Sequence, residues 1–132
     1  MLLGMSSYVA ADSKVILTSE GSTKGSTVIG LDVIAEQSFK AFQFDIDLTG
    51  ATSVDLSSCT ANMVTKMTIS CVQKGNKVRV FAIETTAGKE IVAGKVSIGF
   101  IKVQGLVNPT VFDIEFADKT GEVMQSSAII SK

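Results

Sequence analysis

The stretch from Phe39 to Leu48 reads FKAFQFDIDL, and it constrains the fold more than any other part of the chain. From Phe42 onward the apolar side chains share one parity and the polar side chains the other, the two sets being Phe42, Phe44, Ile46 and Leu48, and Gln43, Asp45 and Asp47. A period of two is that of a β-strand with one face on a core and the other toward solvent. Similar short segments recur along the chain, and none keeps a helical period for the length of a stable helix. The sequence therefore predicts an all-β domain with the phenylalanine side inward.

Turn residues divide the chain into about nine strand segments, a number and spacing typical of sandwiches. These segments are 14–19, 26–33, 39–48, 51–56, 67–73, 77–84, 91–103, 110–116 and 122–131. Lys74-Gly75-Asn76 gives the clearest hairpin signal, because glycine and asparagine tolerate the positive φ of a tight turn. A change of parity within 91–103 predicts a β-bulge near Gly99. We therefore expect a two-sheet antiparallel β-sandwich that is jelly-roll-like.

Length and composition predict one folded domain over residues 12–132. A chain of 132 residues lies within the usual size of a single domain, and 45% apolar with 19% charged residues excludes a disordered segment. Residues 1–11 are small or apolar and uncharged, and Val9-Ala10-Ala11 precedes Asp12 in the manner of a signal-peptide cleavage site. We interpret them as a signal-peptide remnant, which predicts a secreted or cell-surface protein. A short disordered start is the alternative.

The charge balance excludes two classes of partner. Twelve basic residues against 13 acidic ones leave a formal charge of −1, so no basic excess can neutralise a phosphate backbone. No stretch approaches the roughly 20 apolar residues that a membrane helix needs. We therefore expect neither a nucleic-acid partner nor a membrane span.

Cys59 and Cys71 are the only cysteines. An even pair favours a disulfide in an oxidising compartment, whereas the C-x-x-C spacing of redox and metal sites is absent. Two cysteines cannot close a zinc site without histidine, and the chain has none. We predict a Cys59–Cys71 disulfide, with two buried thiols as the alternative.

The chain has little with which to catalyse a reaction. Without histidine, a serine or cysteine nucleophile lacks its usual activating base. Asp45 with Asp47, and Asp113 with Glu115, each share a strand face and could act as a glycosidase acid and base, but such carboxylates are normally solvated. We therefore predict no enzyme and no required cofactor. Calcium is a minor alternative at the acidic segment 113–118, which lacks the dense spacing of a calcium loop.

A flat aromatic platform for sugars is also disfavoured. Such platforms use exposed tryptophan or tyrosine, and this chain has no tryptophan and only Tyr8. Alternation assigns five of the seven phenylalanines to the core, namely Phe42, Phe44, Phe100, Phe112 and Phe116. Phe39 and Phe81 remain as surface candidates.

Three segments resemble the cohesin-type module, whose sandwich is shared by related carbohydrate-binding modules. They are Lys24-Gly25-Ser26-Thr27-Val28, the stretch FKAFQFDIDL, and Gly94-Lys95-Val96-Ser97-Ile98-Gly99-Phe100. In that family the corresponding pieces are a glycine-led second strand, an aromatic-rich third strand and a glycine-led seventh strand. One departure is the loop after the third strand, where Asp47-Leu48-Thr49-Gly50 replaces the family's tyrosine-aspartate step. The resemblance covers residues 14–131 and implies a non-catalytic protein–protein interaction module of a cell-surface or multiprotein assembly.

The resemblance also implies which sheet binds, because in cohesins the equivalents of 39–48, 67–73, 77–84 and 110–116 form the sheet that meets the partner. Parity independently places Val78, Val80 and Ala82 inward, and the opposite parity, with Phe81 in the core, is the alternative. The predicted partner-binding face comprises Gln43, Asp45, Asp47, Lys77, Arg79, Phe81, Ile83, Asp113 and Glu115. A protein partner is the first hypothesis. A polysaccharide bound by a carbohydrate-binding module, or a second copy in a structural homodimer, are the alternatives.

Overall fold

The computed structural model describes residues 12–21, 25–62, 68–84, 94–105, 107–118 and 123–131, and the proposed signal remnant lies outside them. Within these ranges all regular secondary structure is β-strand. The strands are β2 (Asp12–Gly21), β3 (Ser26–Ala35), β4 (Ala41–Asp47), β5 (Ser53–Asp55), β6 (Thr68–Lys74), β7 (Lys77–Ile83), β8 (Gly94–Gln104), β9 (Thr110–Ala117) and β10 (Val123–Ser131). The described part of the chain contains no helix long and apolar enough to cross a membrane.

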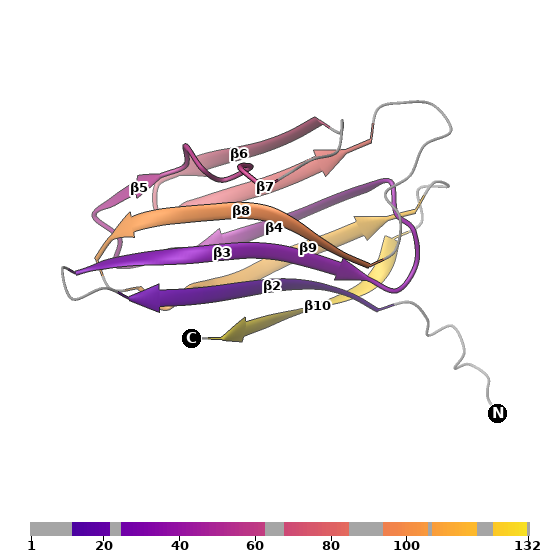
Figure 1. The fold of residues 1–132 in the computed structure, drawn as a ribbon, viewed down its shortest axis with the longest axis horizontal. Helices are drawn as coiled ribbons and strands as arrows, with labels where there is room; N and C mark the ends of the chain where they lie inside the picture. The colour runs from indigo at the N-terminus through magenta and orange to yellow at the C-terminus, as the bar shows by residue number, and fades with distance from the viewer. Residues whose placement is uncertain are drawn as a thin grey trace.

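The strands form two packed layers in the order β5-β8-β3-β2-β10 and β9-β4-β7-β6 (Figure 1). In Figure 1, β2, β3 and β8 lie in front of β4, β7 and β9. Strand β10 joins the layers, because 125–131 pair with β2 while Val123 and Met124 pair with β9. The predicted two-sheet β-sandwich is confirmed. The pairing of β10 with β2 is parallel, whereas every other described strand pair is antiparallel.

The core lies between the layers and is built from the inward parity of each strand. As predicted, Phe42, Phe44 and Ile46 of β4 are buried, as is Leu48 directly after it. Phe39, predicted as a surface candidate, is instead fully buried. Its ring lies 6.0 Å from that of Phe42 and 5.4 Å from that of Phe116, edge-on to both. A bend at Lys40 separates Phe39 from β4, so the alternation of that strand does not extend to it.

Strands β6 and β7 form the predicted hairpin, with Lys74 paired to Lys77 across Gly75-Asn76. Gly75 adopts a φ of 61°, which supplies the left-handed residue that a two-residue hairpin loop requires. The predicted bulge near Gly99 is also present, because Leu31 pairs with Gly99 while the next residue, Asp32, pairs with Ser97. A side chain at position 99 would overlap the backbone carbonyls of Ser58 and Cys59, which pass over this point. Glycine is therefore required there.

Because of this bulge, a second prediction about the core is wrong. Phe100 was expected in the core, yet it is half-buried and faces outward, where the ammonium of Lys102 lies 5.7 Å from its ring centroid. The extra residue reverses the side-chain parity along β8, so Ile98 and Ile101 both point inward and Phe100 does not.

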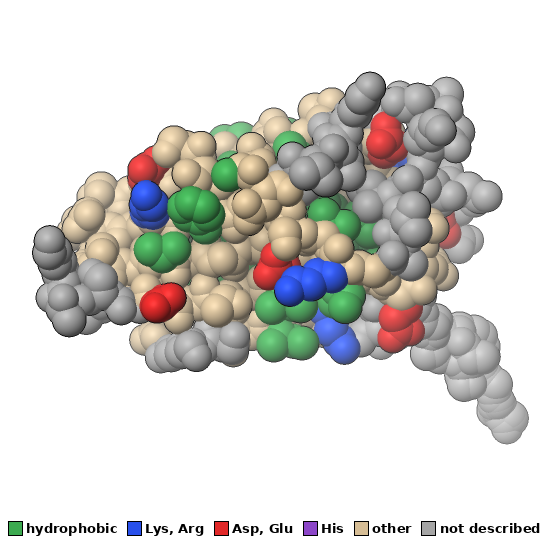
Figure 2. Space-filling view, viewed as in Figure 1, with side chains coloured by type: hydrophobic (Ala, Val, Ile, Leu, Met, Phe, Trp, Pro, Cys, Tyr) green, Lys and Arg blue, Asp and Glu red, His purple; other side chains and the backbone are tan. Residues whose placement is uncertain are grey.

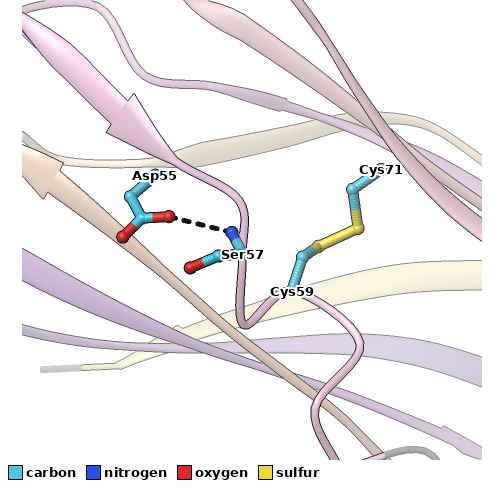
Figure 3. Close-up of a disulfide and its surroundings, with 4 residues drawn as sticks. All are labelled: Asp55, Ser57, Cys59 and Cys71. Carbon is cyan, nitrogen blue, oxygen red and sulfur yellow. Dashed lines mark hydrogen bonds between the residues drawn. A yellow bond between two sulfur atoms is a disulfide. The ribbon is translucent and has the colours of Figure 1, made fainter.

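A disulfide joins Cys59 to Cys71, with their Cα atoms 6.6 Å apart (Figure 3). Cys59 lies in the turn that follows β5, and Cys71 lies in β6. Because β5 and β6 are the outer strands of the two layers, the bond ties the layers together at the side opposite β10. Cys59 is 1% exposed and belongs to the core.

Candidate binding face

The strand registers bring the residues of the predicted face together on the outward side of β9, β4, β7 and β6, which we call the four-strand face. Gln43 lies opposite Phe81 of β7 on one side and Glu115 of β9 on the other. Asp45 lies opposite Arg79, and Asp47 lies opposite Lys77. Residues paired across antiparallel strands project from the same side of a sheet. The predicted set therefore forms one surface, and whether that surface binds a partner remains a prediction.

The parity of β7 determines which side chains this face presents. Val78, Val80 and Ala82 are buried, whereas Phe81 is 36% and Ile83 is 42% exposed. Lys77 and Arg79 are exposed as well. The opposite parity, in which Phe81 would lie in the core, is therefore excluded.

An ion pair between Asp45 and Arg79 lies at the centre of the face. Nε of Arg79 donates to Oδ1 of Asp45 at 2.8 Å, and Nη2 donates to Oδ2 at 3.0 Å. The Asp45 side chain is only 10% exposed, while that of Arg79 is 51% exposed. Hydrogen bonds from a guanidinium to both carboxylate oxygens fix its orientation. The hydrogen bonds and negative charge of Asp45 raise the pKa of Arg79, so the guanidinium stays charged.

Phe112 belongs to this face, although alternation assigned it to the core. Asp45 pairs with Phe112 and Gln43 pairs with Glu115, so β9 carries one residue more than β4 between these two pairs. Asp113 accommodates the bulge with a φ of 52°, a conformation that aspartate adopts more readily than most residues. The bulge turns Phe112 outward, and the ammonium of Lys77 lies 5.3 Å from its ring centroid.

Two hollows mark the four-strand face. The first, which we call the ionic hollow, has a volume of about 460 Å³ and is lined by Asp45, Val72, Lys74, Lys77, Arg79, Phe112 and Asp113. The second, the apolar hollow, has a volume of about 350 Å³ and is lined by Ala41, Phe42, Gln43, Phe81, Ala82, Ile83, Glu115 and Ala117. Both are open depressions lined by residues from adjacent strands.

Sequence reasoning missed three residues of the ionic hollow. Val72 and Lys74 of β6 pair with Arg79 and Lys77, so their outward direction follows from the two-residue hairpin loop. That loop was recognised in the sequence, and counting back from it would have added both residues. Phe112 had no comparable signal, because its direction depends on the bulge in β9.

Hydrogen bonds engage two of the carboxylates of the face. Asp45 is engaged by Arg79, and Asp47 accepts hydrogen bonds from the backbone N–H and the hydroxyl of Thr49 at 2.9 and 2.6 Å. These hydrogen bonds lower the pKa of Asp47 below its ordinary value. Within the ranges that the structure describes, no group of three or more His, Cys, Asp or Glu side chains is placed to hold a metal ion.

The outward side of β5, β8, β3, β2 and β10, the five-strand face, is the side turned to the viewer in Figure 2. Its hydrophobic side chains form small patches beside charged groups, with tan surface between them (Figure 2). Nζ of Lys95 lies 3.9 Å from Oδ2 of Asp32, and Lys102 lies over Phe100. Its hollow, of about 280 Å³, is bordered by Val28 and Phe100 among other residues.

The fold is a cohesin-like β-sandwich. It is similar to a non-cellulosomal cohesin of the archaeon Archaeoglobus fulgidus, with a TM-score of 0.64 and 16% identity over 89% of this chain and 86% of that one. It is also similar to a cohesin of Clostridium acetobutylicum, with a TM-score of 0.60 and 9% identity over 92% and 91%.

A third similar structure is the sixth cohesin of scaffoldin B from Acetivibrio cellulolyticus, in complex with a dockerin. Its TM-score is 0.58, with 13% identity over 89% of this chain and 96% of that one. At such identities the likeness defines the fold alone. No protein-family model and no curated protein sequence matches the chain.

Proposed function

We propose that this chain is a non-catalytic interaction module that docks a partner protein on its four-strand face. One observation carries the proposal: an aromatic side chain, a half-exposed arginine held by a carboxylate, and two hollows occupy one continuous sheet surface. Aromatic and arginine anchors contribute most of the binding energy in protein interfaces. The cohesin of similar fold from Acetivibrio cellulolyticus was crystallised with a dockerin, which makes a dockerin-like module the first partner to test.

We further propose that the module works outside the cell or at its surface. The disulfide between Cys59 and Cys71 supports this, because disulfides persist in oxidising compartments and are rare in the cytosol.

A comparative pull-down tests the proposal. The wild-type chain, Phe81→Ala and Val28→Ala would each be used as bait against extracellular proteins of the source organism. Val28 is the matched control, because it is 39% exposed but lies on the five-strand face. We expect a protein that the wild type and Val28→Ala capture and Phe81→Ala does not.

Two further measurements separate the alternatives. A glycan array reports polysaccharide binding, and a solution mass measured over a range of concentrations reports a homodimer. If Phe81→Ala abolished glycan binding or dimerisation while no Phe81-dependent protein was captured, the proposed function would be wrong.

A further inference from the structure

The four-strand face differs in chemistry from one end of β7 to the other. Phe81 and Ile83 border the apolar hollow, whereas Lys77 and Arg79 border the ionic hollow. Phe81 lies four positions after Lys77 along β7, and at about 3.3 Å per residue this places the two positions about 13 Å apart. A partner that covers the whole face therefore meets two different environments at a defined spacing.

The ionic hollow has an excess of positive charge. Lys74, Lys77 and Arg79 line it together with two carboxylates, those of Asp45 and Asp113. Asp45 is already occupied by both hydrogen bonds from Arg79. Lys74 forms no ion pair within the described part of the chain. The ammonium of Lys77 lies over the ring of Phe112, and its charge also acts on the carboxylate of Asp47, the residue opposite it in β4.

Covering these two ammonium groups removes them from water. Burial of a charge is unfavourable unless an opposite charge or hydrogen-bond acceptors replace the lost water. A carboxylate of the partner supplies both, and it would also be attracted by Arg79. A cationic side chain at the same place would be repelled by Lys74 and Lys77.

The apolar hollow selects for a different side chain. Its outward apolar side chains are those of Phe81, Ile83, Ala41 and Ala117, and its polar members are Gln43 and Glu115, whereas Phe42 and Ala82 are buried beneath it. An aliphatic or aromatic side chain of the partner would contribute the most binding free energy there, because it removes apolar surface from water on both molecules.

Building on the proposed function, we propose that the partner presents an apolar anchor to the apolar hollow and a carboxylate to the ionic hollow, about 13 Å apart. Electrostatic complementarity at the second position then determines which partner is accepted.

Selection from a neutral library tests this. A displayed library of a three-helix scaffold with a randomised surface would be selected against the immobilised wild-type chain. Binders would then be measured against Phe81→Ala, against the double variant Lys74→Glu/Lys77→Glu, and against Lys102→Glu. Lys102 is the matched control, because it also lies over a phenylalanine ring but belongs to the five-strand face. Circular dichroism and thermal melting would verify that each variant is folded.

We expect the selected binders to combine an apolar residue with Asp or Glu. Their affinity should be lost with Phe81→Ala, should fall at least about tenfold with the double variant, and should not change with Lys102→Glu. Replacing the acidic residue of a binder by Lys should restore binding to the double variant.

The remaining outcomes distinguish the two proposals. Binders that need Phe81 but lack acidic residues and tolerate the double variant would overturn the carboxylate inference and leave the proposed function intact. If no Phe81-dependent binder were obtained, or if all binders ignored Phe81→Ala, both proposals would be wrong.

Discussion

The two outer faces of the sandwich expose apolar side chains to a similar degree, yet their organisation differs. On the four-strand face Phe81 is 36% and Ile83 is 42% exposed; on the five-strand face Val28 is 39% and Ile129 is 45% exposed. Exposure alone therefore does not distinguish them.

The arrangement of charge and shape distinguishes them. On the four-strand face, cross-strand pairing places an arginine–carboxylate pair in the wall of the ionic hollow, with the apolar hollow on the same face. Lys74 has no ion pair in the described part of the chain. On the five-strand face Lys95 is near Asp32, Lys102 is near Phe100, and the hollow is smaller. A binding surface is thus better recognised from strand register and incompletely paired charge than from exposed apolar area.

The largest expected effect concerns the bond that joins the two sheets. Replacing both cysteines, in Cys59→Ala/Cys71→Ala, should lower the free energy of unfolding by about 3 kcal/mol, because the loop of 12 residues gains conformational freedom in the unfolded chain. Urea denaturation of the oxidised wild type and the double variant measures this. Intact mass after alkylation checks the oxidation state, and two alkylatable thiols in protein purified without reductant would contradict the disulfide.

Substitutions at two glycines test whether the turn after β5 packs closely on β8 at the edge of the five-stranded sheet. Gly99→Ala should destabilise the domain by about 2 to 3 kcal/mol, because the added methyl group would overlap the backbone at Ser58 and Cys59. Gly30→Ala is the control on the neighbouring strand, where a Cβ would meet atoms of Thr18 at 3.7 and 3.8 Å, an ordinary contact. Equal melting temperatures for the two variants would show that the turn after β5 does not pack on β8 as described.

The third prediction contrasts the two faces directly. Phe81→Ala should weaken partner binding by about 2 kcal/mol, since the aromatic side chain that the partner would cover is lost. Its free energy of unfolding should change by less than about 0.5 kcal/mol, because the side chain is a surface one. Isothermal titration calorimetry with the captured partner and urea denaturation give the two quantities. Equal binding losses for Phe81→Ala and Val28→Ala would remove the distinction between the faces.

The smallest expected effect is a pH dependence of the free energy of unfolding, to which a carboxylate from each sheet contributes. Asp47 of the four-strand face and Asp55 of β5 accept hydrogen bonds from Thr49 and Ser57, which lower the pKa of each carboxyl below its ordinary value. A lowered folded-state pKa gives stability that is present above the unfolded pKa and is lost as the pH falls through the folded pKa. Asp47→Asn and Asp55→Asn should each be slightly less stable than wild type near neutral pH.

That difference should shrink as the pH falls below about 4. Urea denaturation at about pH 6 and about pH 2.5 measures it. A difference that stays constant between the two pH values would show that these hydrogen bonds do not depend on carboxylate charge.

The inward and outward sides of β4 and β7 could be predicted from the sequence, because alternation is a local property that each strand carries in its own residues. It placed Phe44 and Val80 in the core and Arg79 and Phe81 outside, as found. The β6–β7 hairpin was equally local, since Gly75 sits where the turn needs a positive φ.

Phe39, Phe100 and Phe112 could not be placed in this way, because a bend or a bulge interrupts the alternation beside each of them. The bulge in β9 exists only through the register with β4, a strand more than 60 positions earlier in the chain. The ionic hollow has the same origin, since its lining comes from β4, β6, β7 and β9 together. The sequence by itself determined which side chains of a regular strand point toward the core and which point outward. The tertiary structure decided which outward side chains become neighbours, because pairing between strands distant in the sequence sets their register.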